Sequence, residues 1–200
     1  EKERVGMANR LTVGWCGRLT KIKDPFLFID IIQVLKREFD YPVTAIIQGG
    51  GAPEFVAALK EYARKLNLTI TEGTLSQDTD ICIAGWQLNP VNFYEICDFL
   101  LITSINEGTP LTALEAMATG TVVISTPVGG LPDIIKTGIN GFLTFSRSPA
   151  EFVSIINTLI LNRDLYEGIR QKARNYIKSE HSVESLISKT RDLYFNLLKF

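Results

Sequence analysis

Residues 99–118 read FLLITSINEGTPLTALEAMA and place a short apolar strand directly before the start of a helix. The run 99–102 is continuously apolar, which is typical of a strand buried on both faces of a parallel sheet. Thr109 is expected to cap the helix through its hydroxyl, and Pro110 suits the first helical position, where its missing N–H would have no partner anyway. The segment therefore predicts a strand-to-helix unit of an α/β fold.

The loop between this strand and helix carries the components of a ligand site. The first N–H groups of the helix, from Leu111 onward, have no partner within the helix, and with the helix dipole they favour an anion such as phosphate. Gly108 lets a ligand approach the backbone closely. Glu107 and Glu115 repel phosphate, so we expect them to accept hydrogen bonds from uncharged sugar hydroxyls. A nucleotide sugar offers both kinds of group.

The same helix also has a purely structural interpretation. A solvated stripe at helical spacing can run through Thr112, Glu115 and Thr119. The opposite side would then face the core with Leu111, Leu114, Met117 and Ala118. Glu107 can likewise be a loop residue near a helix start, where the dipole favours a carboxylate.

A second loop follows the predicted strand 11–16 and precedes an amphipathic helix predicted over 25–39. It holds Arg18 and Lys23, and an arginine fork with a lysine point charge can clamp a diphosphate. A solvated loop explains the same spacing about as well. Neither a G-x-G-x-x-G fingerprint nor a G-x-x-x-x-G-K-[ST] phosphate loop is present, so the two commonest nucleotide motifs are absent.

Strand-like and helical patterns alternate along the chain, which predicts an α/β fold with a doubly wound parallel sheet. The expected strands cover 11–16, 43–48, 68–71, 81–84, 99–102, 122–125 and 141–144. The expected helices cover 25–39, 53–66, 89–96, 110–119, 131–136, 149–161, 163–179 and 183–198. Such sheets bind ligands beyond the carboxyl ends of their strands, and both loops fall there. The glycines at 49–51 fall there too, and a tight strand-to-helix turn explains them about as well as a ligand site does.

Taken together, these motifs resemble the carboxyl-terminal, donor-binding domain of a family 4 (group 1) glycosyltransferase of the GT-B fold. Four parts agree in order over roughly residues 12–145: GRL at 17–19 with Lys23, GGG at 49–51, EGTP with EAMA between 107 and 118, and VGGLPD at 128–133 followed by GINGFL. The resemblance implies a Rossmann-like doubly wound parallel sheet that forms one half of a GT-B fold.

The resemblance implies roles for individual residues. Arg18 and Lys23 would hold the diphosphate of a nucleotide diphosphate sugar, and Glu107, the third catalytic residue, would accept from hydroxyls of the transferred sugar. Glu115 would take the ribose hydroxyls, and the base would lie near 83–86. The implied donor-binding set is Gly17, Gly85, Trp86, Gly108, Thr109, Pro110, Leu111, Thr112 and Glu115. The donor is a substrate, and no cofactor or metal is implied.

The family resemblance leaves the donor open. Trp86 can stack on a base, although an aromatic residue after a strand is more often packed in the core. Asp24 stands where the family often has glycine, and the stretch 72–80 is longer than usual before the base-binding strand. UDP, GDP and ADP therefore all stay possible as the nucleotide.

The resemblance also implies a domain organisation. Residues 1–10 would be a remnant of an interdomain linker, 11–182 the donor-binding domain, and 183–200 a helix that contacts a missing amino-terminal domain. Because that domain would hold the glycan, lipid-linked or small acceptor, we expect this chain alone to be inactive. The whole enzyme would be a metal-independent, retaining hexosyltransferase of polysaccharide biosynthesis. The alternatives are a GT-B epimerase or phosphorylase, or a noncatalytic sugar-nucleotide-binding module.

Composition argues against several other functions. A formal net charge of −1 argues against nonspecific nucleic-acid binding. Cys16, Cys82 and Cys97 lack C-x-x-C spacing, so we expect buried thiols in a reducing compartment. The only histidine, His181, lies between two predicted helices, so neither a zinc site nor a serine triad can be built. Without an apolar run of about eighteen residues or a secretory signal, we expect a cytoplasmic protein, whose full-length form can work at the cytoplasmic face of the membrane.

Overall fold

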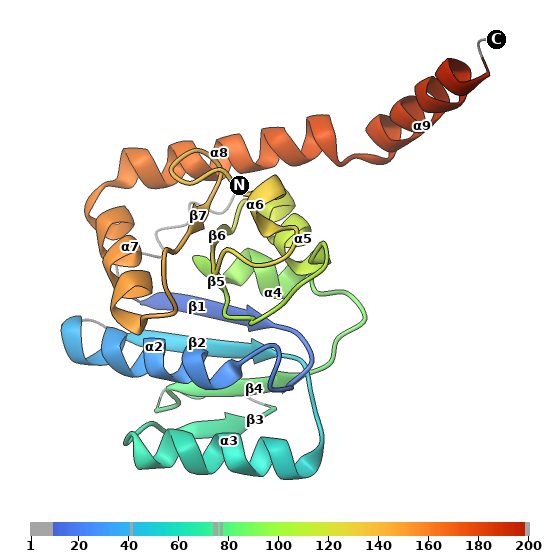
Figure 1. The fold of residues 1–200 in the computed structure, drawn as a ribbon. Helices are drawn as coiled ribbons and strands as arrows, with labels where there is room; N and C mark the ends of the chain where they lie inside the picture. The colour runs from blue at the N-terminus through green and yellow to red at the C-terminus, as the bar shows by residue number, and fades with distance from the viewer. Residues whose placement is uncertain (1–9, 41, 74–75, 77, 199–200) are drawn as a thin grey trace.

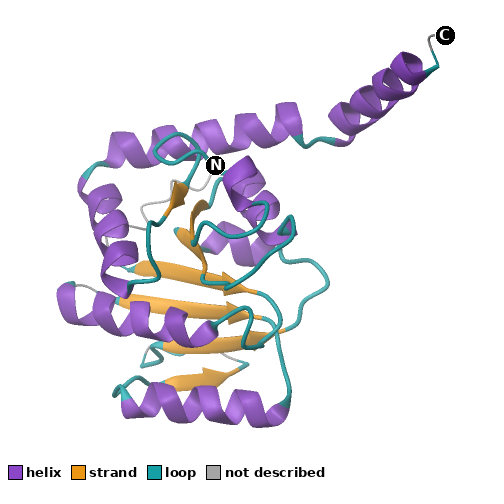
Figure 2. Ribbon diagram, viewed as in Figure 1, coloured by secondary structure: helices purple, strands orange, loops and turns teal. Residues whose placement is uncertain are grey.

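The computed structural model describes residues 10–198 except 41, 74, 75 and 77. Seven parallel strands form one sheet with helices on both of its faces (Figure 1, Figure 2). The strands are β1 (Leu11–Cys16), β2 (Val43–Gln48), β3 (Ile70–Glu72), β4 (Ile81–Gly85), β5 (Phe99–Ile102), β6 (Val122–Ser125) and β7 (Phe142–Leu143). The predicted Rossmann-like α/β fold is therefore confirmed.

The helices bury one apolar cluster on each face of the sheet. Along β5, Phe99 and Leu101 join one cluster while Leu100 and Ile102 join the other, as the twofold alternation of a strand requires. The predicted strand with two buried faces is thus confirmed. The helices are α2 (Pro25–Glu38), α3 (Pro53–Lys65), α4 (Val91–Ile96), α5 (Leu111–Thr119), α6 (Leu131–Ile134), α7 (Pro149–Leu161), α8 (Arg163–Glu180) and α9 (Val183–Leu197).

The strand order places the two predicted loops side by side. The order is β3-β4-β2-β1-β5-β6-β7, so the chain leaves β1 toward one side of the sheet and later returns to β5 on the other side. Open α/β sheets bind ligands at this point of divergence, beyond the carboxyl ends of the strands. The loop 17–24 follows β1 and the loop 103–110 follows β5, so both meet at the switch point.

All predicted boundaries agree with the structure to within two residues, and two of the differences have a clear local cause. β3 begins two residues later than predicted because Asn67 is left-handed (φ 58°) and the Leu68 N–H still bonds to the last turn of α3. α6 ends two residues early because the Lys136 N–H donates to Asn140 Oδ1 at 2.7 Å instead of continuing the helix. α4 also begins two residues late, and β7 has two residues rather than four.

The last helix, α9, extends away from the rest of the molecule (Figure 1). It has no buried residue, and it contacts α8. Its exposed large apolar side chains are Val183, Leu186, Ile187, Leu193, Tyr194, Phe195 and Leu197. Among the described helices, none is long and apolar enough to cross a membrane. Residues 1–9 of the predicted linker lie outside the described residues.

Candidate functional site

An ion pair between the two loops forms the centre of the candidate site. Lys23 Nζ lies 2.6 Å from both carboxylate oxygens of Glu107. Ser104 Oγ donates a further hydrogen bond to Glu107 Oε1 at 2.5 Å. Because the Glu107 side chain is only 7% exposed, its charge needs these partners. The structure therefore brings together two of the three predicted catalytic residues, which are 84 positions apart in the sequence.

Thr103 joins the Lys23 loop to the end of β5. Its Oγ1 accepts a hydrogen bond from Trp15 Nε1 at 3.0 Å. The same hydroxyl donates to the carbonyl oxygens of Lys23 at 3.0 Å and Asp24 at 2.8 Å. Since Thr103 and Trp15 are both buried, the backbone beside Lys23 is held in place from the core of the domain.

Asp24 has a left-handed backbone conformation, which glycine adopts without strain. Its φ is 45°, in the left-handed region that Asp tolerates better than most residues. Oδ1 accepts from the Leu27 N–H at 3.2 Å and caps α2, while Oδ2 accepts a charge-assisted hydrogen bond from Arg147 Nη2. Asp24 therefore adds both a helix cap and an ion pair to the loop.

Glycines allow the loops of the site to approach one another closely. Gly129 has a φ of 57°, and a Cβ on it would lie 1.7 Å from the carbonyl oxygen of Glu107. A Cβ on Gly49 would lie 1.9 Å from the carbonyl oxygen of Gly17. No side chain fits at either contact. Gly17, one of the predicted donor-binding residues, thus lies against the glycine turn that follows β2.

The start of α5 differs from the prediction. Pro110 is the N-cap with an extended ψ of 114°, rather than the first helical residue, and no side chain caps the helix. The predicted Thr109 cap is wrong because the extended Pro110 moves the threonine hydroxyl a residue further from the first turn. In the described part of the chain, no group accepts from the N–H of Leu111 or Thr112. The position of a Cβ on Gly108 is open, and donors of this kind at a helix start favour an anion.

Glu115 lies one turn further along α5 and is exposed. Tyr94 Oη donates to its Oε2 at 2.8 Å. Burial, with Cys16 and Glu115 nearby, raises the pKa of Tyr94, so its hydroxyl stays protonated. Burial also raises the pKa of the Cys16 thiol. The structural interpretation of α5 is wrong for Leu111 and Ala118, which are exposed rather than in the core.

The other predicted residues lie near the same edge of the sheet without joining the ion pair. Arg18 is exposed and makes no hydrogen bond or ion pair with any residue that the structure describes. Trp86 is 66% exposed, so the core-packing interpretation of this residue is wrong. Gly85 lines a hollow of about 450 Å³ together with the three glycines at 49–51.

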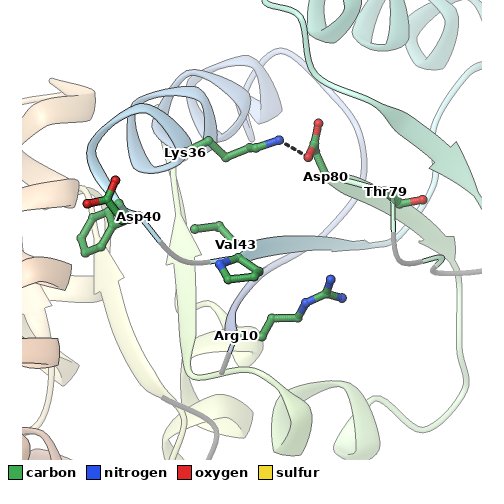
Figure 3. Close-up of a pocket in the computed structure, with 8 residues that line it drawn as sticks. Arg10, Lys36, Asp40, Val43, Thr79 and Asp80 are labelled. Carbon is green, nitrogen blue, oxygen red and sulfur yellow. Dashed lines mark hydrogen bonds and ion pairs between the residues drawn. The ribbon is translucent and has the colours of Figure 1, made fainter. Parts of the chain in front are cut away.

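A hollow of about 430 Å³ lies at the opposite, amino edge of the sheet (Figure 3). The hollow lies where β1, β2 and β4 begin. Lys36 and Asp80, which form an ion pair, are among the residues that line it. Its lining residues are Arg10, Lys36, Phe39, Asp40, Pro42, Val43, Thr79 and Asp80. None of them belongs to the predicted site, so this hollow is separate from the candidate site.

Comparison with known proteins identifies the family. A model described as glycosyl transferases group 1 matches residues 4–176. The chain belongs to this family. It is 29% identical over 158 residues to a D-inositol 3-phosphate glycosyltransferase of Corynebacterium jeikeium, covering 76% of this chain and 36% of that protein. It is 25% identical over 170 residues to an N-acetyl-alpha-D-glucosaminyl L-malate synthase of Bacillus anthracis, with coverage of 85% and 42%. This group 1 chain therefore spans less than half the length of these curated relatives.

Solved structures show the same fold. The C-terminal domain of the group 1 glycosyl transferase LpcC from Francisella tularensis matches with a TM-score of 0.74 and 24% identity, covering 92% of this chain and 95% of that domain. The Anabaena protein HepE in complex with UDP-glucose matches with a TM-score of 0.78 and 24% identity, covering 98% of this chain and 51% of HepE. The predicted resemblance to the carboxyl-terminal domain of a group 1 GT-B glycosyltransferase is confirmed.

Three side chains that position the site of this group 1 chain were not predicted from the sequence. Ser104 and Tyr94 bind the two glutamates, and Arg147 binds both loops. Ser104 had a usable signal, since it is a small polar residue just beyond a strand at the ligand-binding edge. No sequence signal points to Arg147, because its hydrogen-bond partners lie 43, 44 and 123 positions away in the chain.

Proposed function

We propose that this chain is the donor-binding half of a retaining glycosyltransferase that uses a nucleotide diphosphate sugar. The observation that carries the proposal is the Lys23–Glu107 pair at the switch point of the sheet, beside two open N–H groups at the start of α5. A cation and open helix donors suit a diphosphate, and a carboxylate suits sugar hydroxyls. The UDP-glucose held by HepE supports a donor of this class.

Lys23 can serve both parts of such a donor. Its ammonium has three protons, and a single carboxylate group faces it in the described residues. Glu107 would therefore fix the orientation of the Lys23 ammonium. A phosphate bound beside Leu111 and Thr112 would accept a hydrogen bond from an ammonium proton that is already in place. Arg18, exposed on the same loop, would supply the second positive group.

The two glutamates would divide the sugar rings between them. Glu107, oriented by Lys23 and Ser104, would accept from hydroxyls of the transferred sugar. Glu115, oriented by the buried Tyr94 hydroxyl, would accept from the ribose. The base would lie toward Gly85 and Trp86, where an exposed indole is free to stack on it.

The site would accelerate transfer by electrostatic stabilisation of the leaving group. When the glycosidic bond to the donor phosphate breaks, negative charge grows on the departing nucleoside diphosphate. Lys23, which Glu107 orients, and the start of α5 would stabilise that charge without a metal, and the exposed Arg18 would add a second positive group. We infer that Arg18→Ala or Lys23→Ala in the full-length enzyme lowers kcat as well as raising KM, since the charge is greatest in the transition state.

The first test is calorimetric titration of this chain with UDP, GDP and ADP without added metal. We expect one diphosphate to bind, and the Arg18→Ala, Lys23→Ala double variant to lose about tenfold or more in affinity. Lys21→Ala is the matched control because Lys21 is an exposed cation of the same loop. Equal losses in the control and the double variant would show that only general positive charge matters, against the proposed clamp.

We further propose that the remaining part of the full-length protein holds the acceptor and contacts α9. The exposed apolar side chains of α9 and the partial coverage of the relatives support this organisation. The chain alone would then bind donor without transferring sugar. Cys82 and Cys97 are buried thiols that form no disulfide within the described residues, which supports a reducing, cytoplasmic location.

A further inference from the structure

Arg147 connects three loops behind the candidate site. It lies between β7 and α7, and its guanidinium reaches across to the carboxyl end of β5. Nη1 donates to the Ser104 carbonyl at 2.8 Å, and Nη2 donates to the Thr103 carbonyl at 2.9 Å. Nη2 also donates to Asp24 Oδ2 in the β1–α2 loop. One side chain therefore fixes the separation of the two loops that carry Lys23 and Glu107.

Each residue that Arg147 binds is bonded in turn to the Lys23–Glu107 pair. Ser104 Oγ donates to Glu107, and Thr103 Oγ1 donates to the Lys23 carbonyl. Asp24 directly follows Lys23 and caps α2. The guanidinium is thus linked to each member of the pair through one intermediate residue, and among the described residues it forms no hydrogen bond or ion pair with Lys23 or Glu107 itself.

The fork shape of the side chain matters here. Two neighbouring carbonyl oxygens and a carboxylate surround the guanidinium, which presents several donors in one plane. A lysine at this position can form the ion pair with Asp24, but its single ammonium cannot reproduce the planar fork. The arrangement therefore depends on geometry as well as on charge.

We propose that Arg147 is a positioning residue that keeps Lys23 and Glu107 at the spacing required for sugar transfer. The inference rests on the proposed function, since it assumes that this pair contacts the donor. Loss of the guanidinium frees the two loops to separate, which disturbs the pair most when charge develops on the donor. We therefore expect Arg147 to affect kcat more than KM.

The first experiment measures amide hydrogen exchange in this chain without ligand. The Ile105 N–H, which donates to the Ile22 carbonyl at 2.7 Å, and the Leu27 N–H, which donates to Asp24, report whether the loops stay joined. In Arg147→Ala we expect both amides to exchange about tenfold faster at unchanged global stability. Arg174→Ala is the control, because Arg174 donates to the Thr119 carbonyl at the far end of α5. Unchanged exchange at both amides would overturn the inference.

The second experiment measures release of nucleoside diphosphate by the full-length protein from UDP-glucose, GDP-mannose or ADP-glucose. We expect Arg147→Ala to lower kcat about tenfold while KM changes less than about threefold. Arg147→Lys should recover little of kcat, and Arg174→Ala should keep the wild-type value. If Lys23→Ala loses turnover and Arg147→Ala does not, the positioning role is wrong and the proposed function stands. If neither Lys23→Ala nor Arg18→Ala changes turnover, the proposed function is wrong, and the positioning role fails with it.

Discussion

Gly129 illustrates how a residue without a side chain determines where a carboxylate lies. Its α-carbon lies so close to the Glu107 backbone that a Cβ would lie 1.7 Å from the Glu107 carbonyl oxygen. The next residue, Gly130, donates its N–H to the Gly108 carbonyl at 2.9 Å. The loop that carries Gly129 and Gly130 therefore contacts the 103–110 loop through the backbone. Glu107 is held in position by this backbone contact and by the ion pair of its side chain with Lys23.

We expect Gly129→Ala to weaken binding of nucleoside diphosphate by about tenfold or more. The methyl group has no room, so the 103–110 loop must move and carry Glu107 away from Lys23. Gly138→Ala is the matched control, because Gly138 is also left-handed (φ 75°) but has open space at the Cβ position. Both variants should lose about 1–2 kcal/mol from the strained backbone. Calorimetric titration and urea unfolding separate the two effects, and equal affinities in both variants would contradict a role for this contact.

At the scale of elements, the start of α7 depends on one carboxylate. Glu151 accepts hydrogen bonds from the Phe145 and Ser146 N–H groups and from Ser146 Oγ at 2.8 Å. Burial alone would raise the pKa of Glu151, but these hydrogen bonds outweigh it and lower the pKa below the ordinary 4.5. The segment that carries Arg147 is thereby anchored to α7.

The lowered pKa sets the pH dependence of stability. Because the folded state favours the charged carboxylate, its contribution is fully present above about pH 4.5 and is lost as the pH falls through the lower folded pKa. Glu151→Gln should therefore lower the free energy of unfolding by about 0.5 kcal/mol at pH 7, since solvent screens the carboxylate, and by progressively less as the pH falls below 4.5. The control Glu54→Gln changes a carboxylate in the first turn of α3 that makes no hydrogen bond within the described residues. Urea unfolding at several pH values tests this, and a constant difference between Glu151→Gln and the parent would disprove it.

The elements themselves were predictable because their patterns are local. Seven apolar runs predicted the seven strands, and β1, β2, β5 and β6 have the predicted bounds. The errors occur where a single backbone angle decides the outcome. Pro110 could be helical or extended by its intrinsic preferences, and the structure has it extended, which removed the predicted Thr109 cap.

The site was predictable only in part, for a different reason. Lys23 and Glu107 each follow a strand, and parallel topology brings such positions to one edge. The pairing of their side chains required knowledge that β1 and β5 are neighbours, which no local pattern contains. Arg147 is harder still, since it reaches Asp24 across 123 positions from a loop with no motif.

At the scale of the whole molecule, the chain combines a buried sheet with a helix that buries nothing. Val183, Leu186, Leu193 and Leu197 recur along α9 at spacings of three, seven and four, which places them on one face. All four are exposed. Apolar faces of this kind mark interaction sites, and we have proposed the remaining part of the full-length protein as the partner.

We expect the double change Leu193→Glu, Leu197→Glu to act differently in the two contexts. In this chain both leucines are exposed, so the free energy of unfolding, measured by thermal denaturation, should stay within about 0.5 kcal/mol of the parent's. In the full-length protein the same charges would lie against the other domain, where a buried unpaired carboxylate costs several kcal/mol, so the melting temperature should fall by about 4 °C or more. Asp192→Ala, a change to a charged and exposed residue of the same helix, should leave both proteins unaffected. A full-length double variant that melts with its parent would show that α9 does not dock on that domain, and the apolar face would then need a different partner.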